Sequence, residues 1–391
     1  MTLLGKIDLN RLVLRPKSVK DAQTLHQLSG DKTVVPLDEH LGLDKSPFKI
    51  SIGAMLKIAH HVQKSDSYDD AAASLKQQTR IDTNPETIRN VANYIGKIVL
   101  DNDLKRAETT FNLFQSGKLI LPAGDDKHDL YMECYGATFH AREKDEQGHA
   151  WNEIKLGAVF GGNNLHWRFN EKTGKREKKI GLREYTAYAG PVETFQKLLF
   201  DCAVRRGYGR CDNAILLTDG TILIENMKES LFPDAIHILD FFHLSENVRR
   251  FAKEMFRDDE EKYKTWAKDI CKRLRESDSC NVIKELKSID KNTLKKCKFN
   301  LLDYIEKNSN SIDYATYEKN DWYIGSDAIE GGDKTALQER LKLSGMRWNI
   351  ESARYIMALM TKVKSLLWDT DVVDAVYNHL GVTSTKYLDV F

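Results

Sequence analysis

The chain has 391 residues, more than one ordinary domain needs and enough for two or three. Hydrophobic residues make up 41%, which is sufficient for a real core, while 59 basic residues nearly cancel 58 acidic ones. The net charge of +1 argues neither for nor against a nucleic-acid partner, so any basic surface must be local.

Cysteine spacing and hydropathy indicate a cytoplasmic protein. The six cysteines are scattered without a CxxC pair, which favours neither a zinc ribbon nor a disulfide framework and is typical of a reducing compartment. No stretch approaches the roughly 18 apolar residues of a membrane span, and the N-terminus lacks the pattern of a signal peptide. We therefore expect no membrane association.

Residues 1–50 read as an irregular arm or linker, and residues 51–120 as a helical domain. Apolar spacing predicts helices in SIGAMLKIAHHV and SYDDAAASLKQQT. A third helix is predicted to begin with Asn84 as N-cap and Pro85 in the first position, and to end at Gly96.

Two short helices, the second opening NPETIRN, match a helix-turn-helix pattern. In that interpretation Thr87, Arg89 and Asn90 face a DNA groove. The alternative is an ordinary three-helix packing unit that does not touch DNA.

Residues 125–240 change to a period of two and then alternate between strands and helices, which predicts an α/β sheet covered on both faces. Predicted strands include HDLYMECYGATFHAR, KLGAVFGG, LHWRFN, AILLT and AIHIL. Residues 241–320 are Lys-rich and helical, and residues 321–391 hold a Gly-rich start followed by helices.

Candidate catalytic carboxylates lie near the ends of predicted strands and near the start of a predicted helix. Asp219 ends a buried strand before Gly220, a position that lines the crevice of open α/β sheets. Glu330 lies at the start of a helix, flanked by glycines. Asp240 and His243 are too few for a zinc site and are interpreted as a hydrogen-bonded pair, either positioning or structural.

The stretches TDGTILIENMKESLFPDAIHILDFFHLSENV and IGSDAIEGGDKTALQERLKLSGMRWN together resemble the DDE transposases of bacterial insertion sequences. The match is to the branch related to Mutator-type and hAT-type elements and spans roughly residues 36–370. The resemblance implies an α/β RNase H-like core with an all-α insertion and an N-terminal helical DNA-binding region. It also implies DNA as partner, both element ends and target, and a homodimer that holds two DNA ends.

The resemblance further implies three acidic ligands for Mg²⁺ or Mn²⁺, which drive phosphoryl transfer by clamping the attacking and leaving oxygens. The second maps to Asp219 and the third to Glu330. The first maps to Tyr135, before Gly136, where the family has Asp-Gly. A neutral phenol is a poor ligand for Mg²⁺. Glu133, two residues back on the same strand face, is about 6.6–7 Å away along the strand.

Basic residues surround Glu330 and the helix after it, where they are expected to contact DNA phosphates: Lys334, Arg340, Lys342 and Arg347. The alternative for them is a solvated helix face. Trp348 is either a core residue or a platform for an unpaired base.

Four hypotheses follow for function. The first is a transposase whose catalysis is impaired by Tyr135. The second is an active enzyme in which Glu133 or another acidic neighbour replaces the missing ligand. The third is a non-enzymatic DNA-binding protein derived from a transposase, and the fourth a nuclease relative acting on RNA.

Overall fold

The computed structural model divides the chain into two compact units. Unit 1 comprises Met1–Lys105, His140–Ala150 and Glu339–Phe391, and unit 2 comprises Arg106–Phe139 and Trp151–Gln338. The structure describes residues 18, 38, 43–121, 128–144, 148, 150–171, 175–220, 222–257, 259–290, 297–325, 340–342 and 345–382. Most of the predicted arm lies outside these residues, and the predicted domain limits stay predictions.

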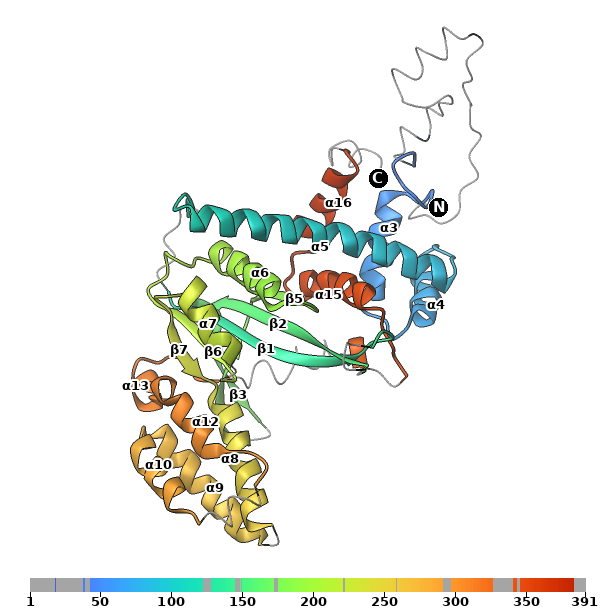
Figure 1. Ribbon diagram of the computed structural model, residues 1–391. Coiled ribbons are helices and arrows are strands. Elements are labelled where there is room, and N and C mark those ends of the chain that lie inside the picture. Colours follow the sequence, from blue (N-terminus) through green and yellow to red (C-terminus); the bar gives the residue numbers. More distant parts are fainter. Residues whose placement is uncertain are drawn as a thin grey trace. The chain divides into compact units, whose positions relative to one another are not determined.

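Unit 1 is helical where it is described (Figure 1). Side-chain caps begin three of its helices: Ser51 and Ser67 accept from Ala54 and Asp70, and Asn84 from the amide of Thr87 at 2.8 Å. The elements are α3 (Ile52–Val62), α4 (Tyr68–Gln78), α5 (Pro85–Gln115, shared with unit 2 from residue 106), α15 (Ile350–Lys364), a π-helix (Trp368–Val373) and α16 (Asp374–His379).

The predicted end of the third helix at Gly96 is wrong, because α5 continues without interruption to Gln115. Glycine costs a helix interior only about 1 kcal/mol relative to alanine, and tertiary packing can outweigh that cost. Here Gly96 faces the backbone of α15: a Cβ on it would lie 2.5 Å from the carbonyl oxygen of Tyr355. The glycine therefore allows two helices to approach closely.

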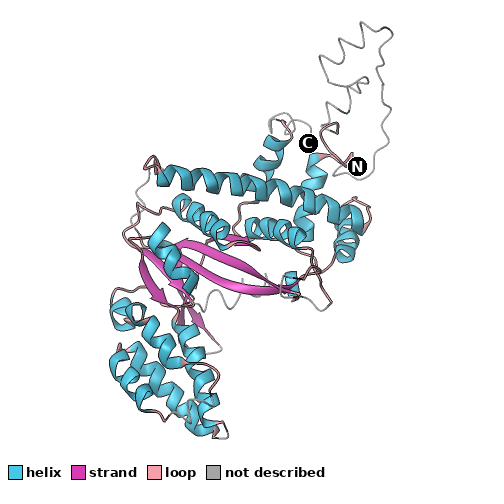
Figure 2. Cartoon of the chain, viewed as in Figure 1, coloured by secondary structure: helices cyan, strands magenta, loops and turns pink. Residues whose placement is uncertain are grey.

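Unit 2 contains a mixed five-stranded sheet, whose strands are magenta in Figure 2. The strand order is β5-β2-β1-β6-β7. β1 runs parallel to β6, and β6 runs parallel to β7. β2 and β5 are antiparallel to each other. The first strand is thus central, as in a sheet built by both hairpin and crossover connections. The bounds are β1 (Leu130–His140), β2 (Trp151–Gly161), β5 (Glu184–Tyr188), β6 (Ala214–Thr218) and β7 (Ile236–Leu239).

A separate antiparallel hairpin joins β3 (Leu165–Asn170) to β4 (Lys175–Ile180). The sequence KREKKI shows no apolar alternation, so β4 was not predicted. It pairs residue for residue with β3, and Lys178 lies 5.4 Å from the ring centroid of Trp167. Pairing with β3 and the cation–π contact favour the strand despite its charged sequence.

Helices complete unit 2. α6 packs on β2 and β5, and the predicted helical stretch after β7 is confirmed as a succession of helices (Figure 1). Their bounds are α6 (Val192–Arg205), α7 (Ile222–Leu231), α8 (Phe241–Phe256), α9 (Glu260–Arg275), α10 (Ser279–Ser288), α12 (Leu301–Lys307) and α13 (Tyr314–Lys319), with 3-10 turns at Gly162–Asn164 and Ser309–Ser311.

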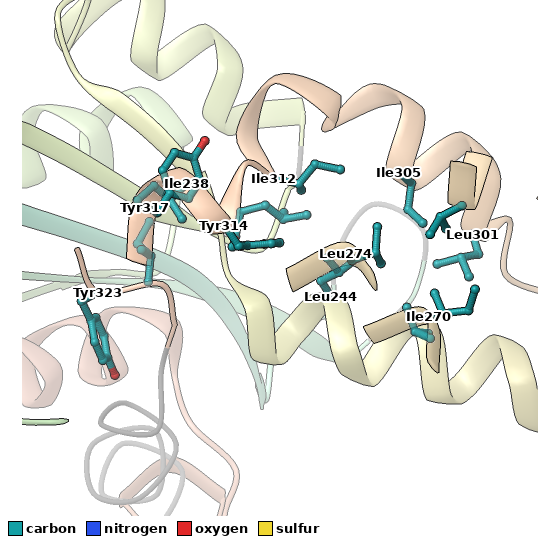
Figure 3. Packing of buried hydrophobic residues seen from close by; sticks show 14 of the residues in the cluster. Ile238, Leu244, Ile270, Leu274, Leu301, Ile305, Ile312, Tyr314, Tyr317 and Tyr323 are labelled. Carbon is teal, nitrogen blue, oxygen red and sulfur yellow. The ribbon is translucent and has the colours of Figure 1, made fainter. Parts of the chain in front are cut away.

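One apolar core connects the sheet of unit 2 with these inserted helices (Figure 3). Ile238 of β7, Leu244 of α8 and Ile305 of α12 are each fully buried or nearly so. Tyr314 is also buried and donates its hydroxyl to the carbonyl of Leu239 at 2.8 Å. Because the core is shared, the insertion is held against the end of β7.

None of the helices in the described part of the chain is long and apolar enough to cross a membrane.

Candidate functional site at the carboxyl edge of the sheet

The candidate site lies within unit 2, where the parallel strands β6 and β7 end beside the middle of β1, which continues to His140. Cys134 of β1 pairs with Thr218 of β6. The residues that follow, Tyr135 and Asp219, therefore lie level with each other. Asp240 follows β7 directly, so sequence-distant segments bring their polar residues to the same edge.

Asp219 is half-buried, and its backbone carbonyl accepts a hydrogen bond from the hydroxyl of Tyr304 at 2.9 Å. The glycine after it is required by the turn. Gly220 has φ of +80°, and a Cβ there would lie 2.7 Å from Leu239 and 2.9 Å from Asn308. The Asp-Gly pair is thus fixed in place by the helical insertion.

Glu133 and Cys134 lie just before Tyr135 on β1, and both side chains are buried. Glu133 is only 2% exposed. Burial raises the pKa of the Cys134 thiol, and the negative charges of Asp219 and Glu133 raise it further. The two carboxylates therefore lie close enough to this thiol to act on its ionisation.

Asp240 caps α8: its Oδ1 accepts from the backbone amides of Phe242 at 2.8 Å and His243 at 3.2 Å. The predicted pairing of Asp240 with His243 thus occurs through the His243 amide. The chain returns to this point after the insertion, because the amide of Phe241 donates to Ile324 and a Cβ on Gly325 would lie 2.5 Å from Oδ1 of Asp240.

Glu330, the predicted third ligand, lies outside the described residues. Within the described ranges, no group of three or more His, Cys, Asp or Glu side chains is arranged to hold a metal ion. Among the described residues at the edge, the oxygen donors are the phenol of Tyr135 and the carboxylates of Asp219 and Asp240. A neutral phenol is a poor ligand for Mg²⁺.

The residues predicted to contact DNA from the helix-turn-helix lie in the first turns of α5 in unit 1. Arg89 and Asn90 are exposed, and Thr87 is half-buried. Arg89 lies 3.4 Å from Glu86, in a pair too exposed to hold it firmly. The helix carrying them has 31 residues, so the second helix of the predicted motif is long rather than short.

Arg340, predicted to be part of a phosphate-contacting surface, is buried, with 4% exposure. Its guanidinium lies 5.7 Å from the ring centroid of Tyr68 and 5.2 Å from that of Trp348. Lys342 and Arg347 are exposed, as a phosphate contact requires. Lys334 lies outside the described residues.

Trp348 is 7% exposed, and its backbone is bridged to the chain after β1. Its amide donates to His140 at 3.0 Å, and its carbonyl accepts from Arg142 at 2.8 Å. Sequence reasoning missed Tyr68 and Arg142 as neighbours of this tryptophan, because each is separated from it by about 200 residues or more and carries no motif of its own.

No family model matches the chain, and no curated protein matches it. Among solved structures, it aligns with the Drosophila P element transposase strand transfer complex at 11% identity, over 68% of this chain and 76% of that chain. The TM-score is 0.21, which is too low for the likeness to support an argument about fold or function.

Proposed function

We propose that this chain is a DNA-binding transposase of the bacterial insertion-sequence type, with an RNase H-like core and with phosphoryl transfer impaired at Tyr135. One observation carries the proposal. The strand that precedes Asp219 is the parallel neighbour of the strand that carries Tyr135, and both residues follow the register pair Cys134–Thr218. That is where a core of this type needs its first two acidic ligands.

The impairment follows from the chemistry of the first position. Two Mg²⁺ ions, when bound, would stabilise the attacking and leaving oxygens of an in-line displacement. A phenol supplies one neutral oxygen there, whereas a carboxylate supplies two oxygens and a charge. Glu133 is 2% exposed, and its register partner on β6 is Leu217. Its carboxylate therefore cannot occupy the position of the Tyr135 side chain unless the strand register slips.

The decisive assay is strand cleavage and joining on DNA carrying the terminal repeats that flank the coding sequence, in Mg²⁺ or Mn²⁺. We expect the natural chain to be silent and Tyr135→Asp to gain activity. Adding Asp219→Ala should abolish the gain. Thr138→Asp is the matched control, because it places the same charge at an exposed position of β1 away from Asp219.

Cleavage by the natural chain would contradict the impairment, and Glu133→Gln would then test whether that carboxylate has replaced the missing ligand. A folded Tyr135→Asp that stays silent but still retards terminal-repeat DNA would favour a non-enzymatic DNA-binding protein. Arg89 and Asn90, both exposed at the start of α5, support this second candidate. The proposal also includes a homodimer on DNA, which light scattering of the complex would measure.

A further inference from the structure

A cavity of about 480 Å³ lies within unit 1, and no role has so far been given to it. It is formed by the start of α4, the first turns of α5, the segment before α15 and the chain after β1. Four arginines line it against one carboxylate, Asp69: Arg89, Arg142, Arg340 and Arg347. The lining is therefore strongly positive although the whole chain is nearly neutral.

The buried polar groups of this cavity are mainly hydrogen-bond donors without acceptors among the described residues. They are Nε and Nη2 of Arg340, Nε1 of Trp348 and the hydroxyl of Tyr68. Asn93 adds a buried acceptor, Oδ1, without a donor, while its amide nitrogen donates to Ser352 at 3.2 Å. Such groups are costly to bury unpaired and are normally satisfied in a folded protein.

Arg340 is the centre of the arrangement. The faces of Tyr68 and Trp348 stabilise its charge by cation–π contact, at 5.7 and 5.2 Å, but they accept none of its N–H bonds. Asp66 acts on Arg340 only through the electrostatic effect of its charge. Burial nevertheless lowers the pKa of Arg340 below the usual range for arginine. A guanidinium held in this way is preorganised for a bidentate anion such as phosphate.

Size and chemistry together define the ligand. A cavity of this volume is in the range of small-molecule sites and exceeds what an isolated phosphate group requires. We propose that it binds a nucleotide, with the phosphate on Arg340 and Arg347 and with Asn93 accepting from the base. The nucleotide is either free or one residue of a bound DNA strand. The inference does not depend on catalysis at the sheet edge of unit 2.

The test measures binding of three probes to the full chain by calorimetry: adenosine monophosphate, inorganic phosphate and a short single-stranded oligonucleotide. Arg340→Gln removes the central charge, and Lys57→Gln is the control, because it removes one charge from an exposed position of α3 that does not line the cavity. A charge-assisted hydrogen bond contributes enough to predict a loss of about 10- to 100-fold for Arg340→Gln. We expect less than about threefold for Lys57→Gln, because a peripheral charge acts only at long range.

Each outcome decides the matter. Tight binding of the monophosphate, weakened selectively by Arg340→Gln, identifies a free nucleotide, whereas the same dependence for the oligonucleotide alone identifies a DNA strand. If Arg340→Gln does not fold, Arg347→Gln and Arg89→Gln, which line the cavity at exposed positions, replace it. The proposal is overturned if no probe binds, if phosphate alone binds as well as the nucleotide, or if cavity and control variants weaken binding equally.

Discussion

A buried ion pair joins α5 to α6 in unit 2, and breaking it should destabilise this unit. Asp201 is 2% exposed and accepts from Arg106 Nε at 2.8 Å and from the hydroxyl of Thr110 at 2.7 Å. Asp201→Asn keeps the shape but leaves Arg106, with 30% side-chain exposure, and Arg205 opposite a neutral amide. Losing one partner of a buried pair costs about 3–5 kcal/mol, and the partial exposure of Arg106 favours the lower value.

The same two helices offer a matched control. Lys197 and Glu108 lie 2.5 Å apart, but Glu108 is 52% exposed, so Glu108→Gln should cost at most about 1 kcal/mol. For a domain of this size, each kcal/mol lowers Tm by about 2–4 °C. We therefore expect Asp201→Asn to lower Tm by roughly 6–12 °C. Scanning calorimetry and urea titration measure both variants.

Equal losses for Asp201→Asn and Glu108→Gln would refute the reasoning, because burial would then not distinguish the two pairs. A loss below about 1 kcal/mol for Asp201→Asn would do so as well. The double variant Asp201→Asn with Arg106→Gln should recover part of the loss, because it also removes the arginine charge that faced the carboxylate.

Two further predictions concern pH and packing. Burial, aided by the charge of Lys228, lowers the pKa of His237 from 6.5 to about 4, so the unfolded chain takes up a proton that the folded chain resists. The contribution of His237 to the free energy of unfolding should thus be fully present above about pH 6.5 and fall by up to about 3 kcal/mol toward pH 4. Urea titration across this pH range should give a flatter dependence of the free energy of unfolding on pH for His237→Gln than for the natural chain. An unchanged pH dependence would contradict the assignment. Gly96→Ala gains about 1 kcal/mol of helix propensity but sets a Cβ 2.5 Å from the Tyr355 carbonyl oxygen, so overpacking of about 1–3 kcal/mol should lower Tm. Thermal unfolding with the exposed Lys97→Ala as control checks this, and a higher Tm for Gly96→Ala would count against the close approach.

Local patterns were sufficient for the elements that meet at the sheet edge. The apolar runs before Asp219 and Asp240 predicted β6 and β7, because strands buried on both faces need continuous apolar sequence. Asn84 and Pro85 predicted the start of α5, since caps act within one turn of the chain. These features depend on neighbours in sequence and can be read from it directly.

Other features depend on partners far along the chain. The charged strand β4 forms by pairing with β3, and Gly96 stays helical because α15 packs against it. Arg340 has the same local sequence context as an exposed helix arginine, yet it is 4% exposed between Tyr68 and Trp348. No periodicity within a single helix reports such a contact.

The sequence by itself determined β6, β7 and the start of α5, and that a tyrosine stands before Gly136, where the family resemblance implies a carboxylate. Only the tertiary structure decided that Tyr135 lies level with Asp219, because strand register is set by pairing across the sheet. It also decided that a buried arginine faces a cavity rather than solvent. The physical reason is common to both: hydrogen-bond periodicity is local, whereas register and burial are set by surfaces that meet only after the chain has folded.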